Sequence, residues 1–95
     1  MVEPAPLKRP RVQYTEQALE MGVQGTSVVR CLIRLDGRAT DCCVASSLPC
    51  VDRAVVDALE ASSWRPATLE GKPVEVDFPI RLTFRLPTVD WRKGP

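Results

Sequence analysis

The sequence predicts a small α+β domain with a three-stranded antiparallel sheet, in spatial order 2-1-3, and two helices packed on one face. Three observations predict this class. Its 95 residues suit one domain and are too few for two. Apolar residues alternate with a period of two in two long stretches, from Thr26 and from Val74, with an amphipathic helical pattern between them. Asp36-Gly37 supplies a tight turn after the first stretch.

The N-terminal region is predicted to be a linker followed by a short helix. Residues 1–13 are rich in proline and have almost no apolar periodicity, which predicts a linker stub. Their basic residues lack interleaved aromatic side chains, which favours a solvated linker over a nucleic-acid arm. The helix begins after Thr15, a favourable N-cap, and stops at Gly22.

The first two strands are predicted to form a β-hairpin. Five alternate residues would share the core face of the first strand: Ser27, Val29, Cys31, Ile33 and Leu35. A two-residue turn at Asp36-Gly37 pairs residue 35 with 38 and residue 34 with 39, and the return strand then covers residues 39–45. This register places Cys31 opposite Cys42, on the core face.

A helix and a third strand follow. Pro49 suits the first turn of a helix whose core-facing positions recur at helical spacing: Val51, Val55, Ala58, Leu59 and Ser62. A turn at Gly71 and Pro73 leads to a strand over residues 74–86 with seven alternating apolar residues: Val74, Val76, Phe78, Ile80, Leu82, Phe84 and Leu86.

The order of the strands follows from their directions. The hairpin makes the second strand antiparallel to the first, and the helix returns the chain so that the third strand pairs antiparallel with the first. Residues 74–86 are then an edge strand, and residues 88–95 are a tail. Pro79 supports the edge position, because the missing N–H of a proline is tolerated there. An exposed edge of this length is either an aggregation liability or a docking site.

Composition excludes several classes of function. The 13 basic and 12 acidic residues give a net charge of +1, too small for a broad basic field that would bind nucleic acid or anionic lipid. Without histidine, catalytic pairs of Ser or Cys with His cannot form. Asp52 lies near a helix N-terminus, where compensation of the helix dipole is a better interpretation than a catalytic acid. We therefore expect no enzymatic activity, metal or cofactor.

The four cysteines allow three complete disulfide connectivities. The hairpin register favours a cross-strand bridge between Cys31 and Cys42. A second bridge, between Cys43 and Cys50, would require the connecting loop to fold back over the strand. Four free thiols are the alternative, and the lack of a Cys-x-x-Cys knuckle argues against a zinc site.

Trp64 and two arginines each have two interpretations. Trp64 follows an amphipathic helix, which favours a core position between helix end and sheet over an aromatic anchor for a partner. Arg81 and Arg85 belong either to a solvated strand face or to a contact with acidic side chains of a partner.

Several short motifs, in this order, resemble the C-terminal domain of TonB-type energy transducers. They are Tyr14…Ala18, Gly25, Asp36-Gly37-Arg38, Ser46-Ser47, Val51-Asp52-x-Ala54, Trp64-Arg65-Pro66-Ala67, Gly71-x-Pro73-Val74 and Phe84-x-Leu86. The resemblance places the domain at residues 14–87. It implies a periplasmic domain at the end of a proline-rich stalk that is anchored in the inner membrane.

The resemblance also implies partners. Such a domain binds the TonB-box peptide of an outer-membrane receptor or transporter by strand addition and conveys energy from an inner-membrane proton-channel complex. The expected docking edge consists of Ile80, Arg81, Leu82, Thr83, Phe84 and Arg85. Two alternatives are a structural trans-envelope linker, similar to TolA and without energy transduction, and a disulfide-stapled inhibitor that presents residues 46–49. The transporter and homodimerisation stay open.

Overall fold

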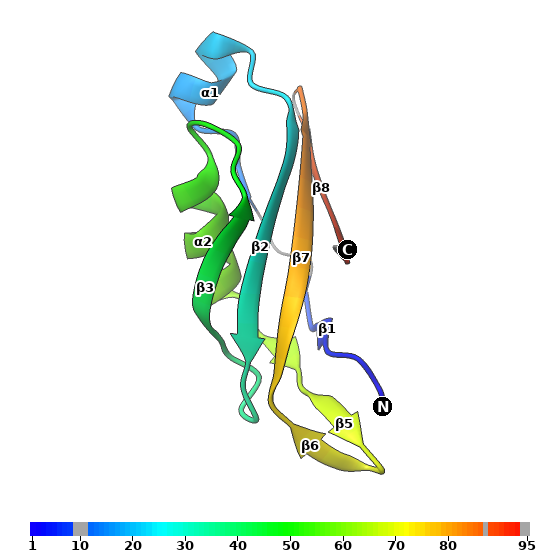
Figure 1. Ribbon diagram of the computed structural model, residues 1–95. Helices are drawn as coiled ribbons and strands as arrows, with labels where there is room; N and C mark the ends of the chain where they lie inside the picture. Colours follow the sequence, from blue (N-terminus) through cyan, green and yellow to red (C-terminus); the bar gives the residue numbers. More distant parts are fainter. Residues whose placement is uncertain (9–11, 87, 94–95) are drawn as a thin grey trace.

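The main sheet has four antiparallel strands, and two helices lie on one side of it (Figure 1). The computed structural model describes residues 1–8, 12–86 and 88–93. The strands are β2 (Gly25–Ile33), β3 (Ala39–Ser46), β7 (Val76–Arg85) and β8 (Thr88–Lys93), in the order β3-β2-β7-β8. The predicted order 2-1-3 is confirmed as β3-β2-β7. The structure adds β8 beyond the predicted edge.

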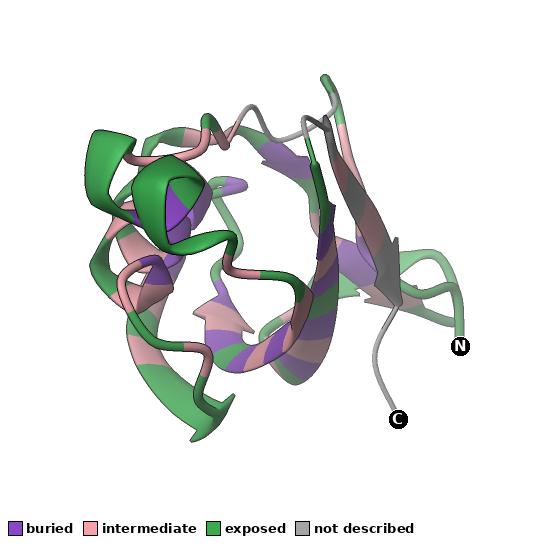
Figure 2. Cartoon of the chain, turned by 90° about the horizontal axis from the view of Figure 1, so that it is seen from above, coloured by how far each residue is buried: buried purple, intermediate pink, exposed green. Residues whose placement is uncertain are grey.

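Both helices are confirmed. Helix α1 (Glu16–Met21) begins where the Thr15 hydroxyl accepts a hydrogen bond from the Ala18 N–H, and it ends at Gly22 in the left-handed conformation. Helix α2 (Asp52–Ala61) starts later than Pro49 suggested, and Val55 and Leu59 form its buried face. Figure 2 shows buried residues alternating with more exposed ones along the strands, and buried residues also occur in both helices.

The core fills the space between these helices and the inner face of the sheet. Its largest fully buried side chains are Trp64, Phe84, Ile33, Leu59, Ile80, Leu82, Val29, Val51, Val55, Cys31 and Ser27. The alternation predicted for both long strands is therefore confirmed in their central parts. It fails at the ends, where Leu35 is 55% exposed and Leu86 is 43% exposed, because both residues lie in turns beyond the ends of the strands.

Two short two-stranded sheets flank the main sheet. Strand β1 (Ala5–Pro6) pairs with β4 (Trp64–Arg65), and the Val2 N–H donates to the Thr68 carbonyl at 2.8 Å. Within the predicted linker stub, Val2, Ala5 and Pro6 therefore pair with the chain that follows α2. Strand β5 (Ala67–Leu69) pairs with β6 (Lys72–Val74), so the predicted strand over residues 74–86 is interrupted at residue 75.

The hairpin between β2 and β3 differs from the predicted two-residue turn. The Arg34 N–H donates to the Arg38 carbonyl at 2.8 Å, which leaves a three-residue loop and pairs Ile33 with Ala39. The register is thus shifted by one residue at the turn. It returns to the predicted one at Arg30, which pairs with Cys43. Between these points β3 has one residue more than β2, and this extra residue forms a β-bulge.

Gly37, at the tip of this hairpin, is enclosed by the chain that follows α2. Its φ is +84°, and its carbonyl accepts a hydrogen bond from the Trp64 N–H at 2.8 Å. A Cβ at this position would lie 2.3 Å from the Trp64 carbonyl oxygen, which is too close for any side chain. Glycine is therefore required both for the turn and for the approach of β4.

We predict that Gly37→Ala lowers the free energy of unfolding by at least about 3 kcal/mol, because a left-handed alanine and a clash with backbone act together. Gly71→Ala is the matched control, since Gly71 has φ +80° and nothing within 4 Å of its added Cβ. It should cost only about 1 kcal/mol. Urea unfolding with the disulfide intact measures both variants. Equal losses would show that the contact with Trp64 is unimportant.

Candidate docking edge

The outer edge of β7 is covered by β8. Residues 80–85 pair with residues 93–88, from Ile80 opposite Lys93 to Arg85 opposite Thr88. The prediction that residues 74–86 form a free edge is therefore wrong, as is the tail predicted for residues 88–95 as far as residue 93. The pairing has a clear physical cause. Val89 and Trp91 alternate along β8, and both pack against the core.

The six residues of the predicted docking edge divide between two faces of the sheet. Ile80, Leu82 and Phe84 are fully buried on the inner face. The side chains of Arg81 and Arg85 are exposed on the other face, and the Thr83 hydroxyl hydrogen-bonds with the Thr26 hydroxyl at 3.3 Å. The outer face of β7 therefore carries exposed charge, and the main-chain groups at its outer edge are paired with β8. Whether these residues bind a partner stays a prediction.

Pro79 indicates which main-chain groups face β8. It lies opposite Arg30 of β2, one residue before the stretch that β8 covers. Because proline has no N–H, it fits the ladder with β2 only where that N–H would point away from β2. Main-chain N–H groups alternate in direction along a strand, so those of Arg81, Thr83 and Arg85 are expected to face β8. These groups are the donors that an added strand would need.

An aromatic cluster lies beneath this edge. The Trp64 ring packs edge-to-face against Phe78, with centroids 6.1 Å apart, and against Trp91 of β8, with centroids 6.0 Å apart. Trp64 is only 1% exposed, which confirms its interpretation as a core residue. Its Nε1 donor is buried without a hydrogen-bond partner among the described residues. Such an orphan donor has a free-energy cost of about 1 to 3 kcal/mol.

A second aromatic contact supports the other end of β7. The Tyr14 ring meets Phe84 edge-on, with centroids 5.2 Å apart. The Tyr14 hydroxyl donates to the Val23 carbonyl at 2.9 Å, which ties the start of α1 to the loop before β2. Burial raises the pKa of the Tyr14 hydroxyl, so this donor keeps its proton at neutral pH.

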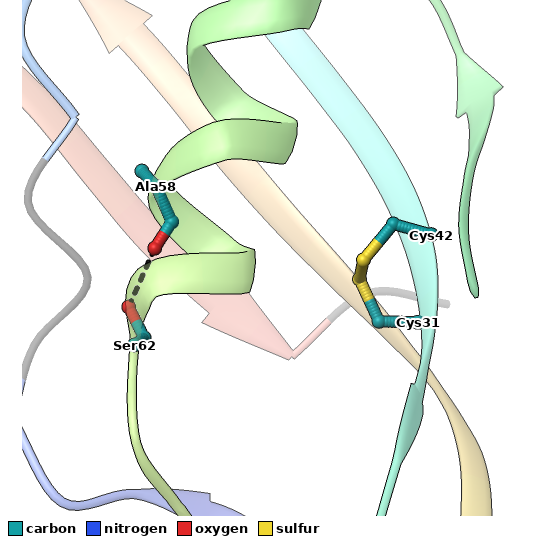
Figure 3. Close-up of a disulfide and its surroundings, with 4 residues drawn as sticks. All are labelled: Cys31, Cys42, Ala58 and Ser62. Atoms are coloured by element: carbon teal, nitrogen blue, oxygen red, sulfur yellow. Dashed lines mark hydrogen bonds between the residues drawn. A yellow bond between two sulfur atoms is a disulfide. The ribbon is translucent and has the colours of Figure 1, made fainter. Parts of the chain in front are cut away.

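The predicted bridge between Cys31 and Cys42 is present (Figure 3). Leu32 pairs with Thr40 and Arg30 with Cys43, so residues 41 and 42 together face Cys31. The bulge brings Cys42 back to the core face. Within the bulge, Asp41 adopts the left-handed conformation, with φ +52°. Cys43 and Cys50 are free thiols, so the second predicted bridge is not formed.

Asp52 holds the loop between β3 and α2. It accepts hydrogen bonds from the Leu48 N–H at 2.9 Å and the Ser27 hydroxyl at 3.3 Å, and from the Ser47 hydroxyl. Its place in the first turn of α2 agrees with compensation of the helix dipole. Sequence reasoning missed the bonds to the loop. An acid a few residues after Ser46-Ser47 is the signal that could have suggested them.

No group of three or more Cys, Asp or Glu side chains within the described ranges is arranged to hold a metal ion. No helix in the same part of the chain is both long and apolar enough to span a membrane.

The fold is a small α+β domain in which β7 pairs with β2 on one edge and with β8 on the other. A family model described as the C-terminal domain of the Gram-negative bacterial TonB protein matches residues 10–86, and the chain belongs to this family. The family is a periplasmic domain of Gram-negative bacteria, and it acts as a binding module. The strands β1 and β8 lie outside the matched residues.

A solved structure agrees with this assignment. The chain is similar to the C-terminal domain of TonB from Pseudomonas aeruginosa, determined in solution by NMR, with a TM-score of 0.69 and 28% sequence identity. The match covers 87% of this chain and 86% of that one. No curated protein sequence matches the chain. The family model and the solved structure therefore agree on the family and the fold of this domain.

We predict that loss of the Cys31–Cys42 bridge lowers the free energy of unfolding by about 3 kcal/mol, because it closes a loop of about a dozen residues in the unfolded chain. The test variant is Cys31→Ala/Cys42→Ala, compared with Cys43→Ser/Cys50→Ser as the control that keeps the bridge. Unfolding by urea gives the stabilities, and mass spectrometry of a non-reduced digest verifies the bridge. A bridge variant as stable as the control would contradict this role.

Proposed function

We propose that this chain is the periplasmic docking domain of a TonB-like energy transducer. It binds the TonB-box peptide of an outer-membrane transporter by strand addition along residues 80–85 of β7. Through an inner-membrane proton-channel complex, it couples the proton-motive force to the outer membrane. Family membership supports the general role. The docking step rests on the geometry of β7.

The single observation that carries the docking step is the pairing of β7 with a short separate strand. Six residues of β7 hold a six-residue partner in antiparallel register, so its edge is straight and long enough to receive an extended peptide. Strand β2 pairs with β7 from the other side over residues 76–84. The peptide would therefore add to a rigid strand, and main-chain bonds would supply most of its affinity.

Side chains on the outer face would tune this affinity. Arg81 and Arg85 are both exposed and lie on the same face of β7, two residues on either side of Thr83. Two guanidinium groups beside an added strand favour a peptide with acidic side chains on that face. This contribution would weaken with salt, whereas the main-chain pairing would not.

We predict that Thr83→Pro weakens binding of a TonB-box peptide at least tenfold, because it removes an N–H expected to face the outer edge. Thr83→Ala is the control. It loses the hydroxyl that bonds to Thr26 but keeps the N–H, so it should bind like the wild type. Amide chemical shifts of labelled protein, followed during peptide titration, give both the affinity and the site.

The shift changes should concentrate on β7 and on residues 88–93. Changes confined to the loop between β2 and β3, to the helices or to the outer edge of β3 would contradict docking on β7. They would leave the family assignment untouched.

A further inference from the structure

We propose that β8 is an internal competitor for the docking edge, a strap that the partner peptide displaces. We also propose that Trp91 marks the place where the partner inserts a large apolar or aromatic side chain against Trp64. This inference rests on the proposed function. It goes further by naming what blocks the edge and what the partner must carry to take it.

Competition follows from the hydrogen-bonding positions. The N–H groups expected to point outward from β7 lie at Arg81, Thr83 and Arg85, and β8 pairs with all three residues. A main-chain donor serves one strand at a time. A peptide that adds to residues 80–85 must therefore replace β8 and not merely lie beside it.

Strand β8 has features of an exchangeable element. It has six residues and pairs with one neighbour, whereas β2 pairs along both of its edges. Val89 and Trp91 pack on the core, and both are half-buried, whereas the apolar residues of β7 beside them are fully buried. Elements at the edge of a sheet with partly exposed contacts open at lower free energy than the core. Opening β8 would leave the three-strand body β3-β2-β7 and its disulfide in place.

The position that the Trp91 side chain occupies against Trp64 would set the strongest requirement on the partner peptide. Trp91 lies opposite Leu82 and meets the Trp64 ring edge-on. When β8 leaves, this side of the Trp64 ring loses its cover, and a side chain of similar size is needed to restore it. The Trp64 Nε1 donor lacks an acceptor among the described residues, so a partner that also brings an oxygen atom there would gain further affinity.

The experiment compares a locked strap with an open one in the full chain, using a Cys43→Ser/Cys50→Ser background. Arg81→Cys/Arg92→Cys locks β8, because these residues are directly opposite and hydrogen-bonded pairs have a separation that a disulfide can span. Arg81→Ser/Arg92→Ser loses the same charges without a crosslink and is the matched control. Trp91→Ala weakens the strap. Each variant is titrated with a synthetic TonB-box peptide.

We expect the locked variant to bind at least tenfold more weakly than its serine control. Trp91→Ala should bind several-fold more tightly than the background chain, because less free energy is spent on opening β8. The two tryptophans give two indole N–H signals, and peptide binding should shift both. Alanine at one apolar position of the peptide should abolish the shift of Trp64 and cost at least tenfold in affinity.

Two negative results have different meanings. If the locked and control variants bind equally well, the strap is overturned while the proposed function stands. If no variant binds, including Trp91→Ala and the serine control, both proposals fail for this class of peptide. Should Trp91→Ala fail to fold, the locked variant and its control still decide between these outcomes.

Discussion

Trp64 is the residue on which four parts of the structure depend. Its N–H bonds to the Gly37 carbonyl at the tip of the β2–β3 hairpin, and its backbone pairs with Pro6 of β1. Its ring packs on Phe78 of β7 and on Trp91 of β8. One residue thus joins four parts of the fold: its backbone contacts the hairpin and the N-terminal segment, and its ring contacts β7 and β8. This arrangement requires glycine at position 37, because the Cβ of any other residue would clash with the Trp64 carbonyl oxygen of β4.

The bulge in β3 corrects the pairing of the same hairpin, and the disulfide links its two strands. The three-residue loop shifts the pairing by one position, which without correction would turn the core face of β3 outward. The extra residue at Asp41 restores the alternation, and Cys42 then meets Cys31 beneath α2. A small core of this size gains from such a staple, since it buries only part of its unfolded surface.

The fold could be predicted from patterns that repeat along the chain. Features that involve single contacts between distant segments could not be predicted in this way. The period of two in β2 and β7, the caps of α1 and the position of the hairpin were correct. The loop length was wrong by one residue, and the tip of this hairpin contacts β4, a segment far along the chain that a local turn signal does not include. Strand β8 could have been predicted from the alternation of Val89 and Trp91, but two apolar residues among charges are a weak signal. The predicted pairing of Cys31 with Cys42 was correct because the bulge in β3 reverses the one-residue shift that the longer loop introduces.

The two segments outside the family match both contact Trp64. Strand β1 holds the backbone of Trp64, and the Leu7 N–H donates to the adjacent Ser63 carbonyl at 2.9 Å. Strand β8 covers the ring of Trp64. Contacts that share a residue are energetically coupled, so the pairing of β1 and the closure of β8 are not independent. Trp64 therefore lies between the N-terminal strand β1, which pairs with its backbone, and β8, which packs against its ring.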